Sequence, residues 1–197
     1  MTRRLPLIPT LIVAAAVAVM IGLGVWQLSR AQWKEQLLAD YRGAAKLPPI
    51  AYPTAPRTGP PPLYRWATGN CLRQVSHRAT AGANRDGEPG YVHIVGCATG
   101  AEGPGMAVEI GWSKDPNAKW QWPGGPVSGV IAPDREHIMR LVAATPPPGL
   151  QPSAVPSVDS ISNNHRLYAI QWFLFAVIAL AIYVLALRKR AQIKPPA

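Results

Sequence analysis

The residues of this chain best suited to chemistry are Asn163, Asn164 and His165, which stand directly before a long uncharged run. Polar side chains at the mouth of a membrane helix are costly unless something uses them. A neutral imidazole can bind a metal ion. His165 is therefore the first candidate for a functional residue.

A helix that begins near Asn164 would carry one stripe of side chains below this imidazole. At spacings of three and four residues, the stripe consists of His165, Tyr168, Trp172, Ala176, Ala179 and Tyr183. A neutral imidazole there could bind the iron of a metalloporphyrin, with the tetrapyrrole lying against Tyr168 and Trp172. The alternative is an interfacial aromatic belt, with His165 and the two Asn residues capping the helix. These residues by themselves leave both interpretations open.

Two uncharged runs must position these groups. Residues 5–29 and 167–187 contain no charged side chain, and each exceeds the roughly 20 residues needed to cross a bilayer core. A secretory signal peptide is the other interpretation of the first run. Against it, the run is longer than an apolar signal core of about 7–15 residues, and the helical pattern continues beyond Trp26 as far as Leu37. We expect two membrane-spanning helices.

The positive charge is concentrated beside these runs. The formal net charge is +10, but all ten acidic residues lie between Glu35 and Asp159. Eight of the twenty basic residues flank the runs, so the middle carries twelve basic and ten acidic residues, a net charge of +2. The positive-inside rule then predicts that both termini are cytoplasmic and the middle is exported. No basic face with interleaved aromatic residues remains for a nucleic acid, so membrane lipid is the expected surroundings.

The exported middle is rich in Pro, Gly and short strand patterns. Candidate strands cover residues 63–68, 73–80, 91–97, 106–112 and 127–132, and residues 139–144 are either a sixth strand or the end of a short helix begun at Pro133. Strands at this spacing favour an antiparallel sheet or a small barrel. The predicted fold is an α+β membrane protein with two transmembrane helices flanking a small exported antiparallel β domain. Gly111, within Ile110-Gly111-Trp112, is expected to permit close backbone packing or a bulge.

The predicted organisation has eight segments. They are a basic tail (1–4), a transmembrane helix (5–29), its extension (30–45), a Pro-rich connector (46–62), the β domain (63–144), a second connector (145–162), a transmembrane helix (163–187) and a basic tail (188–197).

Cys71 and Cys97 lie in the exported part, where disulfides persist. They fall near the ends of strand candidates that we take as neighbours, so a bridge across the sheet is one interpretation and two buried thiols are the other. Their spacing does not resemble a metal site.

The sequence offers few candidates for catalytic residues. The sequence has no GxSxG elbow, no HExxH and no phosphate-binding loop, so we expect no enzyme. His77 and His93 fall in strand candidates and are predicted to be ordinary surface or half-buried imidazoles. His137, beside Asp134 and Glu136, is predicted to belong to a solvated charge cluster.

Both ends of the chain resemble the surfeit locus protein one family, the cytochrome c oxidase assembly factors. The segment GLGVWQLSRAQWKEQLL carries that family's Gly-x-Trp-Gln-x-x-Arg-x-x-x-Lys pattern, matched by Gly24, Trp26, Gln27, Arg30 and Lys34. The segment NNHRLYAIQWF carries its Asn-x-His-x-x-Tyr-Ala-x-x-Trp-Phe pattern, matched by Asn163, His165, Tyr168, Ala169, Trp172 and Phe173. The middle departs from the family at Ile110-Gly111-Trp112, where an Arg commonly precedes Gly-Trp.

The resemblance implies a factor that receives haem a from haem a synthase and helps to place it in oxidase subunit I. His165 would then be an axial ligand of the haem iron. Trp26, Gln27 and Arg30 would lie at the same level on the facing helix, with Arg30 able to pair with a haem propionate. The implied location is the bacterial inner (plasma) membrane, with the central domain in the periplasm. A membrane-anchored structural adaptor without cofactor and a membrane-anchored periplasmic enzyme are the other classes to distinguish.

Overall fold

A computed structural model describes residues 6–54, 58–100 and 105–193. Its contacts divide the chain into two compact units. We call residues 1–37 with 162–197 the helical unit, and residues 38–161 the sheet domain. The predicted tail at residues 1–4 and the last four residues of the predicted tail at 188–197 lie outside the described residues.

The helical unit consists of two long helices, α1 (Leu7–Ala44) and α2 (His165–Ile193). Both are long and apolar enough to cross a membrane. Helix α1 continues to Ala44, so the predicted extension of the first helix is helical. Helix α2 runs past the predicted boundary at residue 187, because the sequence after it contains good helix formers and no Pro or Gly before Lys194.

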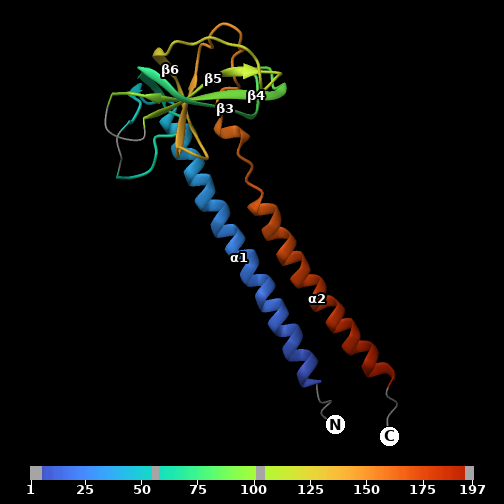
Figure 1. The fold of residues 1–197 in the computed structure, drawn as a ribbon. Helices are drawn as coiled ribbons and strands as arrows, with labels where there is room; N and C mark the ends of the chain where they lie inside the picture. Colours follow the sequence, from blue (N-terminus) through green and yellow to red (C-terminus); the bar gives the residue numbers. More distant parts are fainter. Residues whose placement is uncertain (1–5, 55–57, 101–104, 194–197) are drawn as a thin grey trace. The chain divides into compact units, whose positions relative to one another are not determined.

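The two helices run antiparallel (Figure 1). They contact one another through small residues. Gly24 meets the ring of Phe173 so closely that a Cβ at this position would lie 2.5 Å from the ring carbon Cε1. Ala31, Ala169 and Ala176 are buried. Small residues allow such close approach of membrane helices, which then pack by van der Waals contact. Toward the chain termini, the hydroxyls of Thr10 and Tyr183 lie 2.5 Å apart.

The sheet domain is built on seven strands. They are β1 (Ile50–Ala51), β2 (Trp66–Cys71), β3 (Arg73–Ala83), β4 (Pro89–Ala98), β5 (Met106–Ser113), β6 (Gly125–Pro133) and β7 (Met139–Ala143). The six predicted strands are confirmed with shifted ends, and the sixth is a strand, not a helix end. The strand β1 was not predicted, because it lies in the Pro-rich segment 46–62. A single-turn 3-10 helix, Val158–Ser160, precedes the return to the helical unit.

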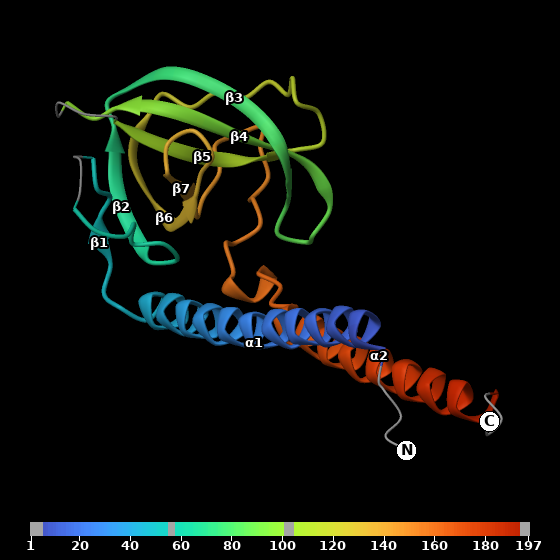
Figure 2. The ribbon, with the colours of Figure 1, turned by 90° about the horizontal axis from the view of Figure 1, so that it is seen from below.

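The sheet is mixed, so the prediction of a purely antiparallel sheet is wrong. Its order is β1-β2-β6-β7-β5-β4-β3, and Figure 2 shows that it is strongly curved. The pairs β1–β2 and β5–β7 are parallel, while the other neighbours are antiparallel. The parallel pair β5–β7 arises because the β6–β7 hairpin places β7 between β6 and β5. Turn residues indicate local hairpins, but they do not indicate this non-sequential order.

Both Pro-rich connectors contact the strands of the sheet domain at residues that the structure describes. In the first, Tyr52 is buried and its hydroxyl donates a hydrogen bond to the carbonyl of Met139, 2.9 Å away. In the second, Gln151 pairs with Trp112 as a β-bridge. The neighbouring Gly111 lies at a register shift between β4 and β5, and a Cβ there would lie 2.9 Å from the carbonyl oxygen of Gln151. The predicted bulge and close backbone approach at Gly111 are confirmed.

Cys71 and Cys97 are joined by a disulfide, with their Cα atoms 5.2 Å apart. The assumption that they end neighbouring strands is wrong. Cys71 ends β2 and Cys97 lies near the end of β4, and three strands separate these two in the sheet order. The curvature of the sheet brings the two ends together. The bond therefore ties one side of the curved sheet to the other.

Candidate functional site

His165 is the first residue of α2, and it faces α1. Its Nδ1 atom lies 2.7 Å from Oε1 of Gln27, a carboxamide oxygen that can only accept a hydrogen bond. The Nδ1 atom of His165 must therefore carry the proton. In the neutral ring this leaves the lone pair on Nε2, the nitrogen that is free to bind a metal. Gln27 thus selects one tautomer of His165 and fixes the plane of its ring.

Three further bonds hold the two helices together around this pair. The side-chain amide of Asn163 donates to the carbonyl of Ala31 at 3.3 Å. The Lys34 ammonium donates to the carbonyl of Ser162 at 2.7 Å. Arg166 and Glu35 form an exposed ion pair at 2.9 Å. The start of α2 is consequently held at several points. The position of His165 depends on all of these contacts.

The predicted aromatic stripe is only partly directed at the other helix. Ala176 of the stripe is buried and Trp172 is half-buried, but Tyr168 is 51% exposed. The side chain that is buried is that of Ala169, four positions after His165 and one position after Tyr168. Trp172 packs edge-on against Phe175, with ring centroids 6.2 Å apart. Tyr168 is thus available to a ligand on the outer surface of the helix pair, and it does not contribute to helix packing.

On α1, Trp26 and Arg30 are both exposed. The Arg30 guanidinium lies over the ring of Trp33, 4.5 Å from the ring centroid, in a cation–π contact. No carboxylate partner for Arg30 is present among the described residues. Arg30 therefore remains available to pair with an anionic group.

These features fit a haem. The chain offers one imidazole nitrogen with a free lone pair, exposed aromatic rings on both helices and a basic side chain without an acidic partner. A haem needs an axial ligand, apolar surfaces for its ring and a cation for its propionates. His165 would hold the iron, Tyr168, Trp172 and Trp26 would contact the ring, and Arg30 would pair with a propionate.

The SURF1 family model matches residues 14–177, which include both end motifs and the sheet domain. The chain belongs to the SURF1 family. This confirms the resemblance carried by the two motifs. No curated protein matches the chain in sequence.

SURF1 family proteins are linked to the assembly of cytochrome oxidase. In this SURF1 family member, the residues of the two motifs meet in space. Gly24 contacts Phe173, Gln27 contacts His165, and Asn163 contacts the first helix at Ala31. Sequence reasoning placed Gln27 at the right level, but it did not identify the hydrogen bond to His165. The facing positions of a Gln and a His at the same membrane depth were the available signal.

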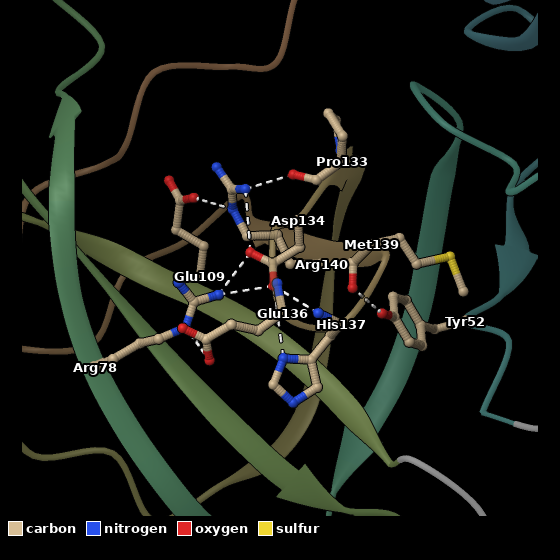
Figure 3. Close-up of polar contacts among 9 residues, drawn as sticks. All are labelled: Tyr52, Arg78, Glu109, Pro133, Asp134, Glu136, His137, Met139 and Arg140. Carbon is tan, nitrogen blue, oxygen red and sulfur yellow. Dashed lines mark hydrogen bonds and ion pairs between the residues drawn. The ribbon is translucent and has the colours of Figure 1, made fainter.

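A second polar cluster, in the sheet domain, corrects a prediction. Figure 3 shows Asp134 at the centre of a network that includes Arg78, Arg140, Glu136 and His137. The expected solvated charge cluster is wrong for Asp134, whose side chain is only 2% exposed, and it holds for Glu136, which is 59% exposed. The Nη2 atom of Arg78 lies 2.6 and 2.7 Å from the two carboxylate oxygens of Asp134. The cluster also includes Glu109, whose 4%-exposed side chain pairs with Arg140 at 2.6 Å.

Asp134 also shapes the turn that follows it. Its Oδ2 atom accepts hydrogen bonds from the backbone N–H groups of Glu136 and His137. The backbone N–H of Asp134 itself donates to the carbonyl of Ile138, a residue with φ of +65°. A β-branched residue seldom adopts this conformation, so the turn is strained and the Asp134 bonds hold it closed.

The pKa of Asp134 reflects these bonds. Burial alone would raise it, but the hydrogen bonds from Arg78 and from the backbone at His137 and Glu136, with the charge of Arg78, outweigh burial and lower the pKa below its ordinary value. The carboxylate is therefore charged at neutral pH, and the network is a set of satisfied ion pairs that stabilises the fold. Nothing in it resembles a poised acid or base.

His77 and His93 form a third cluster. The prediction of ordinary surface or half-buried imidazoles is wrong for His93, which is fully buried. Its Nε2 lies 2.7 Å from Oγ of Ser113, and its Nδ1 lies 3.1 Å from Nε2 of His77. The planes of the two rings are nearly parallel, with an angle of 8° between them and ring centroids 5.4 Å apart. Sequence alternation had placed both residues on strands, but it could not indicate a chain of hydrogen bonds across two of them.

Proposed function

We propose that this protein assists the assembly of a haem-copper terminal oxidase by binding haem a and helping to insert it into subunit I. The observation that carries the proposal is the bond between Gln27 and His165, which places the lone pair of the neutral ring on Nε2, at the start of α2. Membership of the SURF1 family supplies the link to oxidase assembly. The haem would come from haem a synthase, the partner that the resemblance implies.

In this proposal the chain binds and hands over, and it catalyses no reaction. The haem supplies an iron with an open axial position and two propionates. His165 is held in one tautomer by Gln27, and Arg30 offers a charge-assisted bond to a propionate. A single imidazole and a surface ion pair are weak enough to be released. Reversible holding of this kind suits a carrier better than a permanent haem protein.

We further propose a location in the bacterial inner membrane with both termini in the cytoplasm and the sheet domain in the periplasm. Supporting this, the basic clusters flank both apolar helices, and the sheet domain contains a disulfide, a bond that persists in oxidising compartments.

The orientation predicts the oxidation state of the cysteine pair in fresh membranes. Under denaturing, non-reducing conditions, Cys71 and Cys97 should not react with a thiol reagent, and both should react after reduction. A sheet domain that stays in the cytoplasm would expose two reactive thiols instead. A phosphatase that is active only in the periplasm provides the control: fused after Ala197 it should be inactive, and activity there would contradict the orientation.

The assembly role predicts the phenotype of a strain that lacks the protein. Terminal oxidase activity in its membranes should fall severalfold, and subunit I should contain less haem a, because handover from synthase to oxidase is lost. The full-length chain supplied in trans should restore both. Normal oxidase activity and normal haem a content in the deletion strain would overturn the assembly role.

The structural adaptor is the second candidate, favoured by the three bonds between the helices, which can serve helix packing alone. An adaptor needs only the fold. It would tolerate replacement of His165 by a residue of similar size, whereas a haem carrier would not.

A further inference from the structure

The chain of hydrogen bonds at His93 ends on a second open imidazole. The hydroxyl of Ser113 donates its only proton to the carbonyl of Asp115 at 2.6 Å, so its oxygen must accept from Nε2 of His93. A neutral His93 then has its lone pair on Nδ1 and accepts from Nε2 of His77. This leaves the lone pair of His77 on Nδ1, an atom without a hydrogen-bond partner among the described residues.

The hydrogen bond between the two rings needs one acceptor nitrogen, so the two rings cannot both be charged. Burial lowers the pKa of His77. Burial and the adjacent His77 also lower the pKa of His93, against a smaller opposing effect of the Asp115 carboxylate. A neutral imidazole whose N–H is held by a buried acceptor is the arrangement found at metal-binding histidines. For His77 this acceptor is His93, which is itself hydrogen-bonded to Ser113.

His77 lines a depression on the surface of the sheet domain. Its volume is about 790 Å³, within the range of sites that bind cofactors and drug-sized ligands, and it is open to solvent. The flat apolar surfaces of Pro116, Trp120 and Pro148 line it, together with the exposed cation Lys119. Trp120 packs edge-on against His77, with ring centroids 5.0 Å apart, so the ligand nitrogen and the apolar wall are held together.

The surroundings limit what this imidazole could bind. A bare transition-metal ion needs three or four protein ligands, and the described residues contain no group of three His, Cys, Asp or Glu side chains placed to hold one. A single imidazole can complete only a metal that brings its other ligands with it. A metalloporphyrin is such a ligand, since it offers one axial position, a flat apolar ring and anionic side groups.

We propose that His77 is a second imidazole ligand, located in the sheet domain, for a metalloporphyrin with anionic side groups. Trp120 and the two prolines would contact the ring, and Lys119 would pair with a carboxylate. The proposal rests on the proposed function only for the identity of the macrocycle. It adds a solvent-open site to the one on the helical unit, as a carrier that passes its ligand between partners would need.

The experiment titrates ferric protoporphyrin into the full-length protein in detergent, purified without haem, and follows the absorption band of imidazole-bound haem. The wild type should bind two equivalents, His165→Ala one, His77→Gln one, and the double variant none. Glutamine at position 77 keeps an N–H that can donate to His93, so the domain should remain folded. His137→Gln is the matched control, since it removes an imidazole outside the depression and should leave both equivalents.

The possible results separate the two sites. Two equivalents bound by His77→Gln, or none bound by His165→Ala, would overturn the second site. The loss of one equivalent from His77→Gln, together with an unchanged His165→Ala, would keep the second site and reject His165 as a ligand. Lys119→Glu covers the case in which His77→Gln does not fold. It should weaken the second equivalent about fivefold, and unchanged affinity would contradict the proposal.

Discussion

Replacing His165 with alanine is expected to remove haem a from the protein purified from a strain that makes this haem. The test uses a His77→Gln background, so that only the ligand on the helical unit is measured. The haem is lost because its one axial bond to α2 is lost. Membrane insertion should be unchanged, since removal of one polar residue at the rim does not reduce the apolar character of the helix. The readouts are the optical spectrum and the amount of protein in the membrane.

Gln27 provides the matched controls for this result. Gln27→Leu removes the acceptor for Nδ1 of His165 and should weaken haem binding by about 10–100-fold, as the loss of an outer hydrogen bond does at metal sites. Gln27→Glu keeps an acceptor and should restore binding. Arg30→Ala should weaken binding less, because an ion pair near the interface is screened. Equal haem content in the wild type and His165→Ala would refute the ligand assignment.

Replacing Asp134 with asparagine is expected to cost about 3–5 kcal/mol of the free energy of unfolding. The change leaves the Arg78 guanidinium without its closest carboxylate, and it weakens the acceptor that holds the strained turn before Ile138. Domains of this size are stable by about 5–15 kcal/mol in all, so the loss is a large fraction. Denaturant unfolding of the full-length protein, followed by tryptophan fluorescence, measures it.

Glu136→Gln is the matched control, because Glu136 pairs with the same arginine at 3.2 Å but is 59% exposed. This change should cost less than about 1 kcal/mol. A comparable loss in the two variants would mean that the buried network does not stabilise the fold as we infer.

The same carboxylate sets a dependence on pH. The folded-state pKa of Asp134 is lowered, so its contribution to stability is fully present above the unfolded-state pKa of about 4 and is lost as pH falls through the lowered value. The wild type should therefore lose stability below about pH 4, and Asp134→Asn should lose less over that window. Parallel pH curves for the two proteins would contradict this assignment.

Much of the fold could be predicted because its signals are local. The two helices follow from long uncharged runs, and the six main strands follow from short apolar stretches between turn residues. The position of β7 between β5 and β6 could not be predicted, because strand order depends on contacts between distant segments. The short strand β1 was missed for a different reason: Pro-rich sequence usually indicates a spacer, yet Tyr52 anchors this one in the core.

The residues of the candidate site could be proposed from the sequence, but the hydrogen bonds between them could not. Polar residues are costly at a membrane boundary, and this pointed to His165. The partner of its Nδ1 atom depends on how the two helices pack, which the small residues Gly24 and Ala169 determine. In the sheet domain, alternation along β3 and β4 gave no indication that His93 is buried. Burial of a polar ring depends on the hydrogen bonds that it finds, and those come from a distant serine.

The pairing of Gln27 with His165 also has a consequence for biosynthesis. The two residues are 138 positions apart, so at about 5–20 residues per second the ribosome makes Gln27 roughly 7–28 s before His165. During that interval α1 has been made and the sheet domain is still being completed. A nascent chain therefore has no complete binding site on its helices. The proposed haem site on the two helices is therefore complete only in a finished molecule.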